Sequence, residues 1–154
     1  MDESKFIVNN IKQLTFEYKE IESLGIPYAV ENLRLDVRIQ PNYVEKMRID
    51  MFLHVRFELE NEGKKISLLH TDFNIQFDIV SKRIIKKDTE GYLVKKSVFE
   101  QMLFALFFMA QGYLLNQTKG DILQEFIYLI KSPKNYLEEH PNRKKGYILI
   151  SGGN

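Results

Sequence analysis

One segment of the chain is apolar on every side at helical spacing. It runs from about residue 97 to 116, and its centre, Met102 to Ala110, contains no polar side chain. Ser97 and Glu100 have the spacing of a capping box, which predicts the start of a helix here. A helix that lies on one sheet needs an apolar arc of only about 100° or slightly more, so a helix that is apolar all round must be covered by a second surface. The apolar run itself, Met102 to Ala110 with an extension to Leu115, is shorter than the roughly 20 residues that cross a bilayer, so we expect a buried helix and no membrane insertion.

Four segments before this helix alternate apolar and polar residues, the period of a strand with one buried face. They cover about residues 6–18, 33–40, 47–60 and 65–79. In the last two segments the apolar residues have odd numbers. If the two apolar sides share one face of the sheet, the numbers of two paired residues must therefore add up to an even number. A three-residue loop at 61–63, with Gly63 left-handed, meets that condition and a two-residue loop does not. In the first segment the apolar residues change step near Asn9 and Asn10, which predicts a bulge.

The sequence as a whole predicts one α+β domain over residues 1–154. Its 44% hydrophobic and 28% charged residues are typical of a single globular unit. Ser132 and Pro133 predict a second, short helix at about 133–139. The expected fold is therefore a four-stranded antiparallel sheet with the long helix and the short C-terminal helix packed on one face. The polar, acidic first residues show no signal peptide, and we expect a cytoplasmic protein.

Few catalytic or metal-binding patterns are present. The chain has no Cys, which excludes thiol catalysis and Cys-ligated zinc, and it has no Gly-rich phosphate loop or His-Glu-x-x-His helix. His54, His70 and Asp72 lie on the polar sides of neighbouring strands, where they would suit a metal or a general base. Such side chains more often form a solvated sheet face. We expect no enzyme, no cofactor and no metal, and keep this cluster as an open alternative.

Two basic clusters follow the predicted sheet. The first combines six cations, Lys82, Arg83, Lys86, Lys87, Lys95 and Lys96, with Tyr92 nearby, and the second is Arg143 to Lys145. Cations beside an aromatic ring can contact phosphates and stack a base. The net charge is only +1, however, and charge runs in loops are usually solvated, so we expect no nucleic-acid partner.

The unusual property that remains is a surplus of apolar residues. The simplest interpretation is one well-filled core, and the alternative is that some of them line a groove. The groove candidates are Tyr28, Leu33, Leu35, Val37, Phe126, Tyr128, Tyr136 and Leu137. On the long helix, the candidates for contact with another subunit are Phe104, Phe107, Phe108 and Gln111.

Short motifs resemble the SecB-like protein-export chaperones. In the first strand they are Phe6-x-Val8 and Lys12-Gln13-Leu14-Thr15-Phe16-Glu17. In the long helix they are Gln111-Gly112-Tyr113-Leu114-Leu115 and Gln117-Thr118-Lys119-Gly120, and near the end Ser132-Pro133-x-x-Tyr136-Leu137. The similarity extends from Phe6 to Glu139, in the same order of elements.

The resemblance implies a homotetramer, a dimer of dimers, in which the long helices pack between subunits. It also implies an ATP-independent holdase whose grooves hold unfolded client proteins. These grooves would be built from the second strand, the crossover loop at 19–32 and the last helix. Glu17, Glu20 and Glu22 would stand at the docking positions for a SecA-like motor, although the basic, apolar tail departs from the motor-docking members. Some relatives serve one antitoxin instead, so an oligomeric adaptor for a single partner is the alternative.

Overall fold

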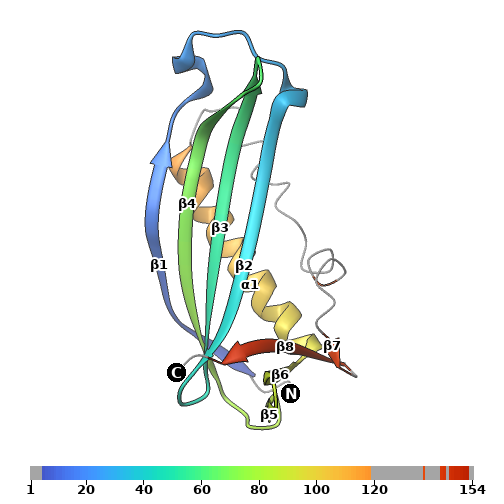
Figure 1. The fold of residues 1–154 in the computed structure, drawn as a ribbon. Helices are drawn as coiled ribbons and strands as arrows, with labels where there is room; N and C mark the ends of the chain where they lie inside the picture. The colour runs from blue at the N-terminus through green and yellow to red at the C-terminus, as the bar shows by residue number, and fades with distance from the viewer. Residues whose placement is uncertain (1–4, 119–136, 138–142, 145, 153–154) are drawn as a thin grey trace.

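The computed structural model describes residues 5–118, 137, 143–144 and 146–152, which form a long sheet with one helix across it (Figure 1). The strands are β1 (Phe6–Tyr18), β2 (Leu33–Val44), β3 (Arg48–Asn61), β4 (Lys64–Ile79), β5 (Ile85–Asp88), β6 (Gly91–Lys95), β7 (Arg143–Lys144) and β8 (Tyr147–Gly152). The helix α1 is Lys96–Gln117, and two 3₁₀ turns, η1 (Ile21–Leu24) and η2 (Val30–Asn32), lie between β1 and β2.

The sheet is larger than expected. The four predicted strands are present and pair antiparallel in the order β1-β4-β3-β2, but the sheet continues through β8 and β6 to β5. β8 joins β2 in parallel through only two residue pairs, Asn42 with Ser151 and Tyr43 with Gly152. The expected four-stranded antiparallel sheet with two helices is therefore wrong. The protein is mostly β, with a seven-stranded mixed sheet, the short β7 beside β8, and one α-helix among the described residues. The helix expected at 133–139 lies outside the described residues, except for Leu137.

Two of the strands missed from the sequence, β5 and β6, are short and contain lysine. Residues 85–88 and 91–95 were expected to belong to a loop because of their basic character. Ile85 and Val94 nevertheless pair across a hairpin and are buried, and β8 covers the other edge of β6. Their burial depends on a strand that comes much later in the chain, which local periodicity does not reveal.

The β3–β4 hairpin matches its apolar faces by a different device from the predicted one. Asn61 pairs with Lys64, so the loop has two residues, Glu62 and Gly63, both with positive φ (51° and 77°). The three-residue loop is therefore wrong. A bulge in β4, opposite Phe57 and Glu58, inserts one extra residue, Leu68. From Phe57 paired with Leu69 onward, away from the turn, the numbers of paired residues add up to an even number. The bulge predicted near Asn9 in β1 is confirmed, and a second one occurs at Leu14.

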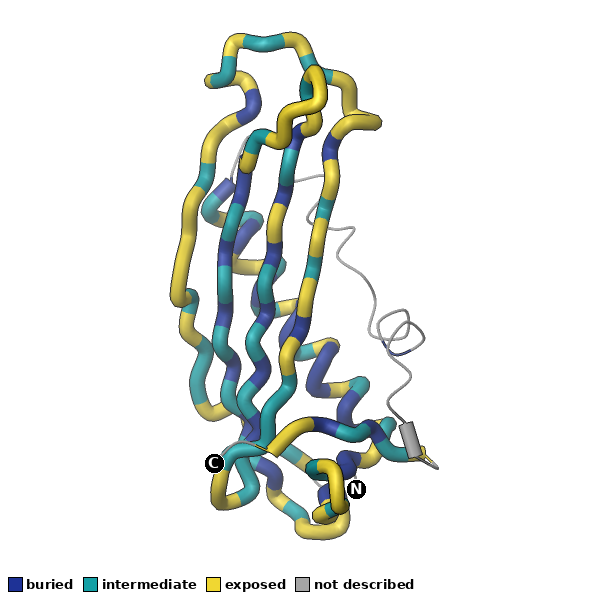
Figure 2. The backbone as a smooth tube through the Cα atoms, in the orientation of Figure 1, coloured by how far each residue is buried: buried dark blue, intermediate teal, exposed yellow. Residues whose placement is uncertain are grey.

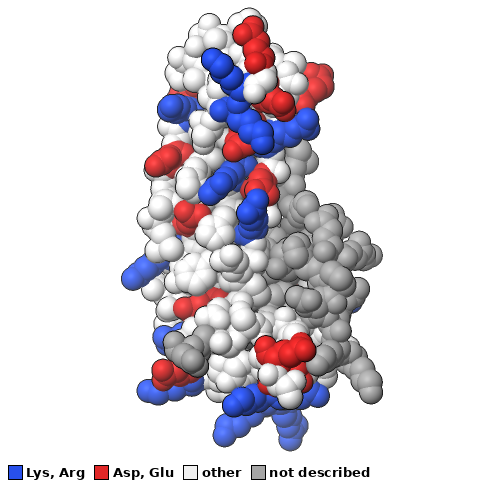
Figure 3. All heavy atoms as spheres, viewed as in Figure 1, with Lys and Arg blue, Asp and Glu red and all other residues white. Residues whose placement is uncertain are grey.

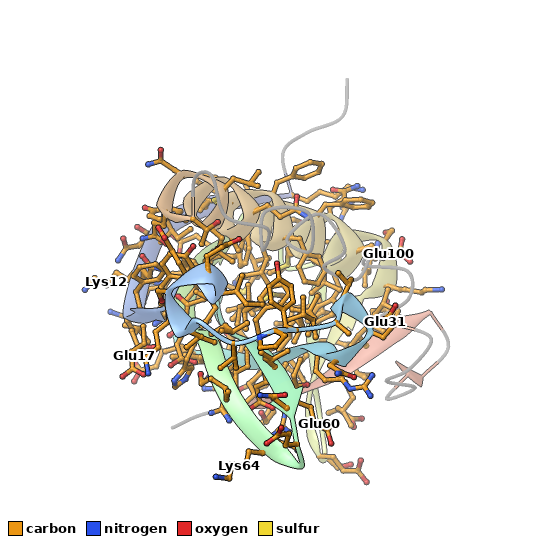
Figure 4. All side chains as sticks on the ribbon, turned by 90° about the horizontal axis from the view of Figure 1, so that it is seen from above. Lys12, Glu17, Glu31, Glu60, Lys64 and Glu100 are labelled. Atoms are coloured by element: carbon orange, nitrogen blue, oxygen red, sulfur yellow. The ribbon has the colours of Figure 1, made fainter. Side chains whose placement is uncertain are left out.

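The core lies between the sheet and the inner side of α1. The odd-numbered residues from 49 to 59 in β3 and from 69 to 79 in β4 are buried on the helix side, and over most of this length they alternate with half-buried positions (Figure 2). Viewed along the strands, side chains fill the space between α1 and the sheet (Figure 4). Each fully buried Leu, Ile or Phe stabilises the fold by about 1.5–3 kcal/mol relative to exposure. From α1 the buried residues are Val98, Phe99, Met102, Leu103, Leu106, Phe107, Ala110 and Leu114.

The start of α1 is fixed by a contact with the turn before β8 and not by a capping box. The N-cap residue is Lys95, which makes no side-chain cap hydrogen bond, and the first helical residue is Lys96. The Lys96 N–H donates to the carbonyl of Gly146 at 2.9 Å, and the Lys96 Nζ lies 3.9 Å from the Glu100 carboxylate. The predicted pairing of Ser97 with Glu100 is therefore wrong, because the turn before β8 occupies the helix start.

Candidate functional site

The outer side of α1 is an exposed apolar surface. Phe104 is 50% exposed and Phe108 is 69% exposed, although the residues between them that face inward are buried. The two residues are one helical turn apart, and their rings stack with centroids 6.4 Å apart. Phe107 points into the core and is only 5% exposed, and Gln111 is half-buried. Of the predicted subunit-contact residues, Phe104 and Phe108 therefore form the outer surface.

A hollow of about 560 Å³ adjoins Phe108 on this surface. Its wall includes Met109, Gly112 and Tyr113 of α1 and Ile11 of β1. A Cβ atom built at Gly112 meets no other atom within 4 Å, so the missing side chain leaves the space open. The outer side of α1 thus carries a projecting ring and, one turn later, a hollow lined by apolar residues. We call this surface, from Phe104 to Tyr113, the α1 outer surface.

Gln117, which lines the hollow near the end of α1, is paired with a glutamine of β1. Gln13 of β1 and Gln117 of α1 exchange hydrogen bonds in both directions, at 2.9 and 2.6 Å, and Gln13 also donates to the Thr71 hydroxyl at 2.8 Å. These bonds hold the last turn of α1 on β1. β1 is the outermost strand on this side, and several of its apolar side chains are exposed: Ile7, Val8, Leu14 and Phe16.

Of the predicted groove residues, the structure describes five, and they do not all line one hollow. Leu33 is buried, whereas Tyr28, Leu35 and Val37 are half-buried and pack against the core from the β2 side. Phe126, Tyr128 and Tyr136 lie outside the described residues. Leu137 is buried and lines a separate hollow of about 840 Å³.

This larger hollow lies where β2 and β8 diverge beyond their short parallel contact. Ile39 of β2, Phe99 of α1, and Ile148 and Ile150 of β8 line it together with Leu137. The sequence pointed to Leu137 and to β2, but it did not point to β8. The short run of apolar, β-favouring residues Tyr147 to Ile150 was the available signal, and only its position beside β2 reveals a role in a hollow.

The sheet face opposite α1 is polar, and Asp72 of β4 is its most connected side chain. Its carboxylate accepts a 2.5 Å hydrogen bond from the Thr15 hydroxyl and a close hydrogen bond with Nδ1 of His54, and Nε2 of His70 lies 3.3 Å away. Burial by itself would raise the pKa of Asp72, but the hydrogen bonds and the neighbouring histidines outweigh it and hold the pKa below its usual value. The structure therefore brings His54, His70 and Asp72 together. In the described part of the chain, however, no group of three such side chains has the geometry to hold a metal ion.

Asp50, on the same face, has the opposite environment. Burial raises its pKa, and the charge of Arg48 and a hydrogen bond from Gln76 reverse only part of that shift. One carboxylate oxygen of Asp50 is buried and has no hydrogen-bond partner in the structure. The polar face is thus a set of cross-strand contacts with one poorly solvated acid.

The predicted docking acids lie at the end of the molecule where β1 stops. Glu17 pairs with His70 across the sheet, Glu20 precedes η1, and Glu22 lies in η1; all three are exposed. Acidic and basic side chains intermix at this end (Figure 3). These three acids therefore do not form a surface of one sign.

α1 is long and apolar enough, by length and composition alone, to cross a membrane, although its inner side is packed on the sheet. A scan against protein-family models finds no match for this chain, and searches of curated proteins and of solved structures return none either.

Proposed function

We propose that the chain is an oligomeric, ATP-independent holdase in the cytoplasm that binds non-native polypeptides by apolar contact. The observation that carries the proposal is the stacked pair Phe104 and Phe108, which stands exposed on a helix whose other side is fully buried. Monomeric proteins rarely expose contiguous apolar surface, and larger patches mark contacts with other chains. The similarity of the sequence to SecB-like chaperones is consistent with this role.

The occupant of the α1 outer surface is a second copy of the chain. A two-fold interface must be self-complementary, because the same surface is used by both subunits. The projecting Phe108 ring and the open hollow at Gly112 supply both halves of such a contact, one helical turn apart. In a two-fold pair, each Phe108 would enter the hollow of the other copy, where buried apolar area contributes about 25 cal/mol per Å².

Client polypeptides would then bind on the β2 side of the molecule. Leu35 and Val37 offer half-buried apolar side chains along β2, and the 840 Å³ hollow continues this apolar lining at Ile39 and Leu137. Contacts of this kind depend on apolar area and not on hydrogen-bond geometry, so they tolerate many client sequences. No catalytic step is required.

The assembly is tested with Phe104→Asp and Phe108→Asp. Each places a charge in the proposed interface, where burial of an unpaired charge is strongly unfavourable. We expect the dissociation constant to rise by on the order of 100-fold or more, seen as a smaller mass by light scattering. Gln101→Asp, an exposed position on the same side of α1 outside the hollow, is the control and should keep the wild-type mass. An unchanged mass in both phenylalanine variants contradicts the proposal.

Client binding is tested with Leu35→Asp. Loss of one leucine contact should weaken suppression of aggregation of several unrelated denatured proteins by roughly tenfold, without a change in subunit number. Arg34→Asp, exposed on the opposite face of the same strand, is the matched control. Protection of one protein only, among many tried, would favour the adaptor for a single partner over the holdase.

A further inference from the structure

A run of cations lies at the end of the molecule formed by the β4–β5 linker and β5. Residues 82–87 read Lys82-Arg83-Ile84-Ile85-Lys86-Lys87, so four of six residues are basic and none is acidic. Ile84 and Ile85 are 3% and 8% exposed, whereas the four cations are all exposed. The two isoleucines anchor this segment in the core and leave the charges outside. Basic atoms gather along the lower edge of Figure 3, where Figure 1 shows the linker and β5.

Two further cations come to the same end. The carbonyl of Lys5 accepts a hydrogen bond from the Val80 N–H at 3.1 Å, and Lys46 lies in the β2–β3 turn, whose Met47 carbonyl bonds the Ile79 N–H at 2.7 Å. We call the six cations Lys5, Lys46, Lys82, Arg83, Lys86 and Lys87 the basic end. Three acids, Glu45, Asp88 and Glu90, accompany them, so positive charge is in excess. Within the described part of the chain, none of the six forms an ion pair with a carboxylate.

The aromatic rings of this end are already occupied. Tyr92 stacks on Tyr43 with centroids 3.9 Å apart, and the Lys86 ammonium lies 4.2 Å from the centre of the Tyr147 ring. Single-stranded nucleic acids gain much of their affinity by stacking bases on free aromatic faces, and each of these three rings already has one face in contact with another side chain. A large apolar side chain, Val80, stands 56% exposed two residues before Lys82.

Flexible lysines beside an exposed apolar side chain, on a turn and an outermost strand, match a flat anionic surface better than they match a groove. We infer that the basic end docks reversibly on membranes rich in anionic lipid, while α1 stays packed on the sheet. Lys82, Arg83 and Lys87 contact the headgroups, and Val80 enters the interfacial layer between them. This inference does not depend on the proposed holdase function.

The test is flotation of the full chain with vesicles of phosphatidylcholine alone or mixed in equal amounts with phosphatidylglycerol. We expect binding only to the anionic vesicles at low salt and release at about 1 M salt, where the Debye length is about 3 Å. The triple variant Lys82→Gln, Arg83→Gln, Lys87→Gln should lower the partition coefficient roughly 100-fold, because each cation near the surface contributes about a fivefold factor. The matched control removes three exposed lysines at the opposite end, Lys19→Gln, Lys64→Gln and Lys65→Gln, and should stay within about twofold of wild type.

Each of three other results would overturn the inference. Equal losses in the two triple variants would show that net charge alone is sensed. Binding that survives high salt would show insertion of apolar surface such as α1. Binding to a labelled single-stranded oligonucleotide, with none to either vesicle, would identify a nucleic acid as the partner.

Discussion

Asp72 connects three strands on the polar face of the sheet. Its carboxylate contacts Thr15 from β1, His54 from β3 and His70 two residues earlier on its own strand. The alternation of polar residues in β3 and β4 predicted that His54 and Asp72 share a face. The contact with Thr15 was not predictable, because two bulges in β1 shift its register by one residue each.

Replacement of Asp72 should reveal a pH-dependent contribution to stability. The folded state holds the pKa of Asp72 below its ordinary value of 3.8, so it favours the ionised form. This contribution is complete above pH 3.8 and is lost as the pH falls through the lowered folded-state pKa. We expect Asp72→Asn to reduce the free energy of unfolding by roughly 1–3 kcal/mol at pH 7, and the difference from wild type to shrink with acidification.

Urea denaturation at pH 7 and in acid measures this effect. Asp36→Asn is the control, because Asp36 is exposed and its pair with Arg38, at 3.2 Å, is on the surface. An exposed ion pair contributes at most about 1 kcal/mol. If the two variants lose equal stability at pH 7, the Asp72 contacts do not stabilise the fold as described.

At the scale of the elements, α1 is the part for which sequence reasoning was most informative. Its uniformly apolar centre predicted a helix that its own sheet could not cover, and Phe104 and Phe108 do remain exposed. The sequence did not reveal which side faces the sheet, so Phe107 was grouped with its neighbours although it is buried. The helix begins within one residue of the predicted start, but the capping box was wrong, because the first helical N–H bonds Gly146, which lies far away in the sequence.

A substitution at Gly112 should change helix stability and assembly in opposite directions. Gly112→Ala should stabilise α1 itself by about 0.5–1 kcal/mol, since Gly is a poor helix former and the added Cβ meets no atom within 4 Å. The same methyl group would occupy the hollow that we propose receives Phe108 of a second copy. We therefore expect a raised Tm in dilute solution together with weaker association, measured by mass against concentration. Gln101→Ala, outside the hollow, should not weaken association.

The β3–β4 hairpin shows why matched faces do not determine a turn. The sequence predicted that the numbers of paired residues add up to an even number, and from Phe57 paired with Leu69 onward they do. The buried residues of both strands share the helix side there. The parity rule excluded a two-residue loop as long as both strands were taken to be regular, so the extra residue was assigned to the loop. The chain instead accommodates it at Leu68, inside the strand.

For the whole molecule, assembly should make thermal stability depend on protein concentration. If folded copies associate through the α1 outer surface, mass action stabilises them against the unfolded chain. We expect the Tm of the wild type to rise with concentration and that of Phe108→Asp to stay constant, as followed by circular dichroism. A wild-type Tm that is independent of concentration over about a 100-fold range would indicate a monomeric protein.

The late position of β8 in the chain constrains how the sheet forms during synthesis. β8 lies between β2 and β6, yet it is synthesised long after both. While the chain emerges from the ribosome, the β5–β6 hairpin therefore has no neighbour on its inner edge, and Leu93 and Val94 lack the strand that buries them. Such distant pairings form late and slowly. During its own biosynthesis the nascent chain thus passes through a stage with a bare strand edge, at which aggregation competes with completion of the sheet.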